Sequence, residues 1–309
     1  MNNKFFLFLA VMLLVSSCET RKKKEHGGKP EYPRVLDLND TCPIVISIHG
    51  TLPPIAASIL HVIDAPIGLV PAHKLNRRFL LSRFLYLLSE GDPEAYPLAS
   101  CYSFGWSGKL TFSARRNAAE MLYQQIRGYK GPITLIGHSH GGNVALELGR
   151  IIAARHDTHL NIDKLILLAT PIQEATAQYA ASPIFKHVIS LYSMGDWTQI
   201  SDPQGTYYAS KYIERCCNVK VPLFSERKLK NFLNVVQARV IIGGSDLGHL
   251  DFIRTAFVHQ LPAVIDLLSG VNIDGTIHTV SIPRDRCKKP FFVELKKVRN
   301  KKKWVEVKD

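Results

Sequence analysis

The stretch Ile-Thr-Leu-Ile-Gly-His-Ser-His-Gly-Gly-Asn-Val-Ala at residues 133–145 decides the fold of this 309-residue chain. It begins with a short apolar run, as in a buried strand, and ends in a helical pattern. Between them lies Gly-x-Ser-x-Gly, the pattern of a nucleophile elbow when it joins a strand to a helix. Gly137 and Gly141 lack a Cβ, so the two backbones can pass close together. The stretch therefore predicts that Ser139 projects from a sharp turn, and that the His140 amide points toward any anion forming beside it.

Short apolar runs continue on both sides of this stretch and alternate with helical patterns. The candidate strands are residues 43–48, 98–104, 133–136, 164–169, 187–194 and 238–243. The candidate helices are residues 113–127, 143–155 and 250–268, with Ser113 as the expected N-cap of the first and Gly128 at its end. Continuous apolar strands are typical of a parallel sheet buried on both faces. The predicted fold class is therefore α/β, with a mostly parallel central sheet and helices on both faces.

Three segments depart from a minimal alternation of strands and helices. Residues 53–97 and 197–234 are long for connections, and segments of that length are usually functional or contain helices of their own. For the first, a lid or pocket wall and a pair of extra core helices both remain open. Residues 271–309 form a basic C-terminal extension, in which residues 291–295 and 303–307 alternate like the two strands of a hairpin.

The N-terminus has the pattern of an export signal. A basic start and a short apolar run predict a signal peptide at residues 1–17, too short to span a bilayer comfortably. Val15-Ser-Ser-Cys18 resembles a bacterial lipobox, which implies lipidation of Cys18 and a flexible tether at residues 18–34. An ordinary cleaved signal or an uncleaved anchor is the alternative, because residues 21–24 carry more positive charge than the start. The resemblance implies a bacterial envelope protein, anchored to a membrane outside the cytoplasm.

Composition indicates a globular protein with an uneven charge distribution. The chain is 46% hydrophobic and 21% charged, and its formal net charge is +13. Residues 284–309 hold eleven Lys or Arg against four Asp or Glu, so this tail contributes +7. Either it contacts an anionic surface or it only aids solubility. The chain has no nucleic-acid-binding motif, so no specific nucleic-acid partner is expected. The cysteines other than Cys18 are odd in number and lack zinc-site spacing, so we expect neither a disulfide scaffold nor a metal site.

Chemistry at Ser139 requires two further side chains, because a serine hydroxyl is a poor nucleophile at neutral pH. A histidine has to accept its proton, and a carboxylate has to orient that histidine and stabilise its charged form. Candidates for both follow later strands of the expected sheet: Asp196 follows the strand at 187–194, and His249 follows the strand at 238–243. We therefore expect Ser139, Asp196 and His249 to act together.

Other residues compete for these two roles. For the acid, Glu174 follows the preceding strand. Asp246 is the second rival, but it lies only three residues before His249, which leaves it little room to reach the imidazole from behind. For the base, His259 is the rival, although its helical setting favours a surface or packing role. His138 occupies a variable elbow position and is expected to line the pocket.

Over residues 40–268 the chain resembles the α/β-hydrolase family, particularly its lipases and esterases. The resemblance implies the chain order Ser, acid, His, which Ser139, Asp196 and His249 satisfy. It also implies an oxyanion hole made by the backbone amides of Thr51 and His140, with His49 shaping the loop before Thr51. The hydrolase domain would cover residues 35–270, with the two long segments as lid-like insertions. No metal or organic cofactor would be needed.

These patterns predict a membrane-tethered serine hydrolase that cleaves carboxylic esters through an acyl-enzyme. Its partners would be an ester or lipid substrate, the membrane that holds Cys18, and an anionic surface at the basic tail. Two alternatives stay open. One is a catalytically silent lipoprotein that uses the fold as a binding module, and the other is an acyltransferase or thioesterase with the same site, because the fold does not fix the reaction.

Overall fold

A computed structural model of the chain describes residues 35–52, 64–196, 198–199, 229, 233–271 and 277–283, and the backbone of residues 292–297 and 302–306. The predicted signal peptide, Cys18 and the tether lie outside these residues. So do residues 53–63 of the first long segment and nearly all of the second. Within the described part of the chain, no helix is both long enough and apolar enough to span a bilayer.

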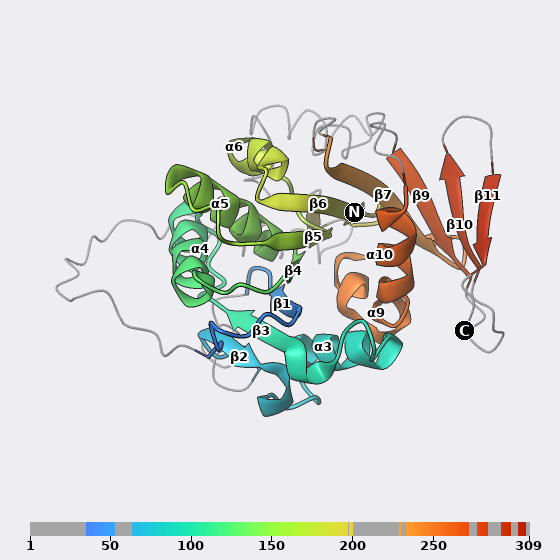
Figure 1. Ribbon diagram of the computed structural model, residues 1–309. Helices are drawn as coiled ribbons and strands as arrows, with labels where there is room; N and C mark the ends of the chain where they lie inside the picture. The colour runs from blue at the N-terminus through green and yellow to red at the C-terminus, as the bar shows by residue number, and fades with distance from the viewer. Residues whose placement is uncertain are drawn as a thin grey trace, which may run out of the picture.

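The described strands form one 11-stranded sheet (Figure 1). Their order across the sheet is β11-β10-β9-β7-β6-β5-β4-β1-β3-β2, with the short β8 paired to β7. In this order, the seven strands from β9 to β3 are parallel to one another. The strands β2, β8, β10 and β11 are antiparallel to their neighbours. The strands are β1 Ile44–Ile48, β2 Gly68–Pro71, β3 Cys101–Gly105, β4 Ile133–His138, β5 Ile162–Leu168, β6 Phe185–Tyr192, β7 Val235–Ile242, β8 Ser245–Asp246, β9 Ile277–Ile282, β10 Phe292–Lys297 and β11 Lys302–Glu306.

Helices cover both faces of the sheet because alternate strand residues point to opposite sides. Ile44, Ile46 and Ile48 of β1 pack in one apolar cluster with α4 and α5, whereas Val45 packs in another with α3 and α10. The α-helices are α3 Leu80–Gly91, α4 Phe112–Ile126, α5 His140–Ala154, α6 Glu174–Ala177, α9 Thr255–Val258 and α10 Leu261–Ser269. The 3-10 helices are Ala72–Lys74, Leu98–Ser100, Gln178–Ala181 and His249–Ile253. The predicted fold class, a mostly parallel sheet with helices on both faces, is confirmed.

Each strand expected from the sequence has a counterpart, but the one expected at residues 98–104 begins only at Cys101, because residues 98–100 form a 3-10 helix. Two helix predictions also need correction. Helix α4 begins at Phe112, one residue before the expected range, and its N-cap is Thr111, not Ser113. Thr111 has an extended backbone, and its Oγ1 accepts a hydrogen bond of 3.1 Å from the Ala114 amide. Ser113 lies inside the first turn and cannot cap it. The end of the helix is as predicted, since Gly128 follows with a φ of +88°.

The single helix expected at residues 250–268 is wrong. The chain instead forms the 3-10 helix His249–Ile253, then α9, then α10. Arg254 has an extended backbone (φ −97°, ψ 158°), which ends the first segment. Pro262 lies in the first turn of α10, where its missing N–H costs nothing. Apolar periodicity alone conceals these breaks.

The described part of the first long segment belongs to the core. β2 pairs antiparallel with β3, and α3 packs against the sheet with Leu85 and Leu88 fully buried. No side chain caps α3 from its own N-cap. Asp64 does so from outside the helix, accepting hydrogen bonds from the amides of Leu81 and Ser82 at 3.0 and 2.8 Å. Residues 80–91 therefore form one core helix, where one alternative expected a pair, and Leu81 and Phe84 of this helix also line a cleft, as the other alternative expected.

The C-terminal segment, expected as an extension, continues the sheet. β9 lies parallel to β7, and the sequence patterns did not predict it. β10 and β11 then form an antiparallel pair with Val293 opposite Val305, which confirms the hairpin expected near residues 291–307. The tail's backbone therefore forms the strands beyond β9, at the end of the sheet opposite β2.

Candidate active site

The turn between β4 and α5 has the geometry of a nucleophile elbow. β4 ends at His138, α5 begins at His140, and Ser139 between them has a φ of 54° and a ψ of −133°. A positive φ is strained for a residue with a side chain, and it persists only where the surroundings enforce it. The Ser139 amide donates to the Leu168 carbonyl at 2.8 Å, and the Gly142 amide donates to the Ser139 carbonyl at 3.0 Å. These contacts hold the serine at the C-terminal edge of the sheet.

The structure joins Asp196 and His249 directly. Asp196 Oδ2 accepts a hydrogen bond of 2.8 Å from His249 Nδ1, and Asp196 Oδ1 accepts one of 3.0 Å from the Gln199 amide. The Asp196 side chain is fully buried, whereas the His249 side chain is 11% exposed. Because a carboxylate accepts and does not donate, Nδ1 carries the proton and Nε2 of the neutral ring is left as the base.

His138 places this pair beside the elbow. Its ring centroid lies 4.8 Å from that of His249, and the rings are tilted by 46°. Since Ser139 is the next residue, the acid and base predicted from later loops reach the nucleophile turn. Within the described contacts, no hydrogen bond connects Ser139 Oγ to His249. Such bonds are often long without substrate and tighten when it binds.

The loop after β1 lies against the Ser139 side chain. A Cβ added to Gly50 would lie 2.6 Å from Ser139 Cβ and 3.1 Å from its Oγ, so only glycine fits there. Thr51 is the residue that follows Gly50 in this loop. Thr51 Oγ1 is buried and has no hydrogen-bond partner among the described residues. The amides of Thr51 and His140, predicted as oxyanion donors, therefore belong to two segments that flank Ser139.

His49 and Trp106 fix the shape of this loop. His49 Nε2 accepts a hydrogen bond of 3.1 Å from the Trp106 amide, so the proton of the neutral ring lies on Nδ1, which donates to the Gly50 carbonyl at 2.7 Å. The indole Nε1 of Trp106 donates to the His49 carbonyl at 2.7 Å, and the two rings stack at 5.8 Å. Sequence patterns missed Trp106, although it follows β3 at the same sheet edge.

Two of the three rival residues have side-chain partners other than the proposed catalytic residues. His259 is partly exposed, and its Nε2 lies 3.3 Å from Glu90 Oε2, in line with the surface or packing role expected. Asp246 forms an ion pair with Arg239 at 2.6 Å. Burial alone would raise the pKa of Asp246, but hydrogen bonds and the charge of Arg239 outweigh it, so this pKa lies below its usual value. The side chain of Glu174 lies outside the described part of the structure.

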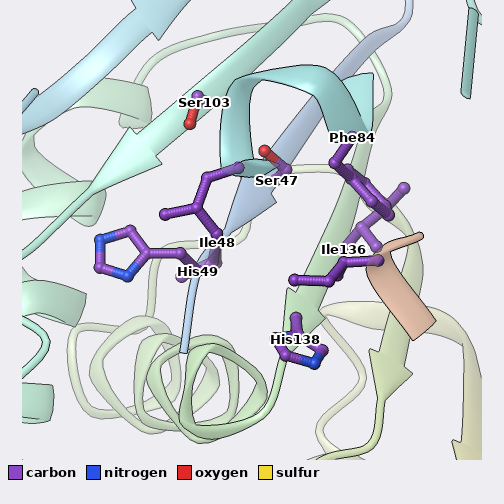
Figure 2. A pocket seen from close by; sticks show the side chains of 9 residues that line it. Ser47, Ile48, His49, Phe84, Ser103, Ile136 and His138 are labelled. Carbon is purple, nitrogen blue, oxygen red and sulfur yellow. The ribbon is translucent and has the colours of Figure 1, made fainter. Parts of the chain in front are cut away.

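A cleft lies beside the elbow, on the α3 face of the sheet (Figure 2). Ile136 and His138 of β4 lie on the face of the sheet that α3 covers, and Phe84 of α3 packs on that face. The residues lining the cleft are Ser47, Ile48, His49, Leu81, Phe84, Ser103, Ile136, His138 and Ile253. Among the described residues, no group of three or more His, Cys, Asp or Glu side chains is arranged to hold a metal ion.

Comparisons with known proteins give only distant structural likenesses. No family model and no curated protein matches the sequence. A protein assigned as a hydrolase from Agrobacterium vitis S4 has a TM-score of 0.39 and 14% identity, covering 74% of this chain and 88% of that one. An esterase from Pyrobaculum calidifontis has a TM-score of 0.34 and 12% identity, covering 79% and 68%. A thermostable carboxylesterase from a metagenomic library has a TM-score of 0.29 and 10% identity, covering 80% and 72%. Likenesses at this level carry no argument about chemistry.

Proposed function

We propose that this protein is a serine hydrolase that cleaves carboxylic esters, with Ser139 as nucleophile, His249 as base and Asp196 as the orienting acid. The observation that carries the proposal is the 2.8 Å hydrogen bond between Asp196 and His249, formed beside a strained serine turn. These residues are more than 50 positions apart along the chain, and packing of the His249 ring on His138 brings them to one edge of the sheet. A structural role alone does not require a buried Asp–His pair at a strained serine.

The reaction would run in two half-steps. Ser139 Oγ attacks the ester carbonyl while His249 Nε2 takes its proton, and the buried Asp196 carboxylate stabilises the imidazolium. The amides of Thr51 and His140 donate to the oxyanion of the tetrahedral intermediate. Its collapse breaks the bond to the alcohol, which leaves with the proton from His249. A water molecule then attacks the acyl-enzyme by the same route, releasing the acid and restoring Ser139.

The cleft favours an apolar acyl group. Five of its nine lining residues are apolar, and His138, which also lines it, precedes Ser139 in the chain. The apolar residues are Ile48, Leu81, Phe84, Ile136 and Ile253. The cavity itself is small, about 20 Å³, so an acyl chain would fit there only after the cleft widens. The Val15-Ser-Ser-Cys18 pattern supports the further proposal of a lipid anchor in a bacterial envelope. The substrate class would then be acyl esters available at a membrane surface.

Labelling with a fluorophosphonate tests the nucleophile directly. The wild-type protein should label at Ser139 and should hydrolyse p-nitrophenyl esters, whereas Ser139→Ala should do neither and should keep its melting temperature. Loss of kcat in the variant should reach several orders of magnitude. Unchanged ester turnover in Ser139→Ala would refute the proposal. A wild-type protein that neither labels nor turns over any ester would favour the silent binding module.

The anchor needs a separate test, because it is independent of the catalytic residues. Bacterial cells expressing the full chain are fed an alkyne fatty acid and then fractionated. The wild-type protein should carry the label and sediment with membranes, and Cys18→Ser should lose the label. Equal labelling of the two proteins would remove Cys18 as the anchor site.

A further inference from the structure

His138 is a buried histidine for which the proposed reaction has no step. It is the last residue of β4 and is only 7% exposed. Its Nε2 lies 3.1 Å from the backbone carbonyl oxygen of His249. A carbonyl oxygen only accepts, so the proton of a neutral His138 ring must be on Nε2, with Nδ1 unprotonated. One side chain therefore contacts His249 both at its backbone and, through the ring packing, at its side chain.

The contacts of His138 and Asp196 are complementary. Asp196 holds the His249 imidazole at Nδ1, which sets its tautomer but leaves the ring able to pivot about that bond. His138 holds the carbonyl of the same residue, and its ring limits the pivot from a second direction. Small errors in the placement of a base cost large factors in rate, because proton transfer needs hydrogen-bond distance and alignment.

We infer that His138 is a positioning residue that holds His249 in the orientation needed to take a proton from Ser139. This inference rests on the proposed function for its catalytic consequence, but the hydrogen bond and the tautomer can be measured without any activity. His138 acts through His249 and is not itself a base for Ser139.

The electrostatics agree with this role. Burial, reinforced by the nearby His249 and by His49, lowers the pKa of His138 to about 3, against the opposing effect of its hydrogen bond to the His249 carbonyl. His138 therefore stays neutral across the working pH range. A neutral ring packs against the His249 imidazolium without the repulsion that a second cation would add.

Two replacements separate the hydrogen bond from the packing. His138→Gln keeps an N–H donor at nearly the distance of Nε2 but removes the ring, whereas His138→Phe keeps a ring and removes the donor. For ester hydrolysis we expect kcat to fall about tenfold or more in His138→Phe with little change in KM. We expect His138→Gln to recover most of the loss. Melting temperatures report folding separately.

NMR of protein with 15N-labelled histidine gives the readout that needs no turnover. We expect His138 in the Nε2–H form at neutral pH, with no titration above pH 5. We also expect the low-field His249 Nδ1 proton to broaden in His138→Phe and to stay sharp in His138→Gln. An Nδ1–H tautomer, titration of His138 near pH 6.5, or wild-type kcat in both variants would overturn the inference, whereas rescue by Phe but not by Gln would assign the positioning to the ring packing. If these spectra are as expected but wild-type protein hydrolyses no ester, the proposed function fails and the positioning contact stands.

Discussion

Arg239 holds the carboxylate of Asp246 by two hydrogen bonds, of 2.9 and 2.6 Å, and the same carboxylate reaches the turn that carries Asp196. Asp246 Oδ1 accepts from the Met194 amide at 3.4 Å and from Ser193 Oγ at 3.3 Å. Asp246 is the last residue of β8 and lies three residues before His249, so its carboxylate connects the turn of the acid to the segment of the base. A charged pair with two parallel bonds has a defined geometry, which suits it to fixing loop positions.

Asp246→Asn should lower stability in a pH-dependent way. The folded-state pKa of Asp246 lies below its ordinary value of 3.8. Its contribution is therefore fully present above the unfolded pKa and is lost as the pH falls through the folded pKa. For a partly exposed pair we expect a loss of about 1 kcal/mol or less at pH 7. Urea unfolding of both proteins at pH 7 and pH 3 checks this, with Glu90→Gln as an exposed control. A difference that grows toward low pH would contradict the assignment.

Asp196→Asn should decrease kcat far more than replacement of either rival acid. The amide can present its N–H to His249 Nδ1 and so favour the wrong tautomer, an effect of about 10⁴-fold in serine proteases. Glu174→Gln and Asp246→Asn are matched controls, because each also replaces one carboxylate by an amide. We expect them to retain kcat within about tenfold. Steady-state hydrolysis of a p-nitrophenyl ester compares the three. A larger loss in Glu174→Gln would transfer the role of the acid to Glu174.

The Thr51 hydroxyl should add to the oxyanion hole. Among the described residues it is buried without a hydrogen-bond partner, and it follows Gly50, where an added Cβ would lie 2.6 Å from Ser139 Cβ. A buried unpaired hydroxyl costs stability, and a developing oxyanion would pair it in the transition state. Thr51→Val, which keeps the shape, should reduce kcat by about 10²-fold with little effect on KM, and Thr51→Ser should retain activity. If Thr51→Val only raises the melting temperature and leaves kcat unchanged, the hydroxyl plays no part and the backbone amide alone would remain as the donor of Thr51.

The sequence predicted those elements that local chemistry dictates. Buried strands such as β4 and β5 are continuous apolar runs, and the elbow is encoded by Gly137, Ser139 and Gly141 within five positions. The positions of Asp196 and His249 followed from a general property of parallel sheets. Loops after consecutive strands share one edge, so polar residues there are brought together.

Contacts between distant segments could not be read from the sequence. The capping of α3 by Asp64 spans 17 positions, and the hydrogen bond from the Trp106 amide to His49 spans 57. The link from Asp246 to Met194 spans 52. Each depends on how loops pack, for which no local pattern exists. The helix expected at residues 250–268 was wrong for a related reason, since tertiary packing overrode a continuous apolar periodicity.

Gly141→Ala should disrupt the elbow itself. A Cβ at position 141 would lie 2.2 Å from the Ile48 carbonyl oxygen and 2.6 Å from that of His49, both backbone atoms that cannot move without shifting β1. We expect a destabilisation of about 3 kcal/mol, together with slower fluorophosphonate labelling, because the loop bearing Thr51 follows β1. Gly270→Ala is the matched control, since a Cβ there would meet nothing closer than the Leu267 carbonyl at 3.8 Å. Thermal unfolding measures both. Equal stability of the two variants would mean that α5 does not approach β1 as closely as this geometry requires.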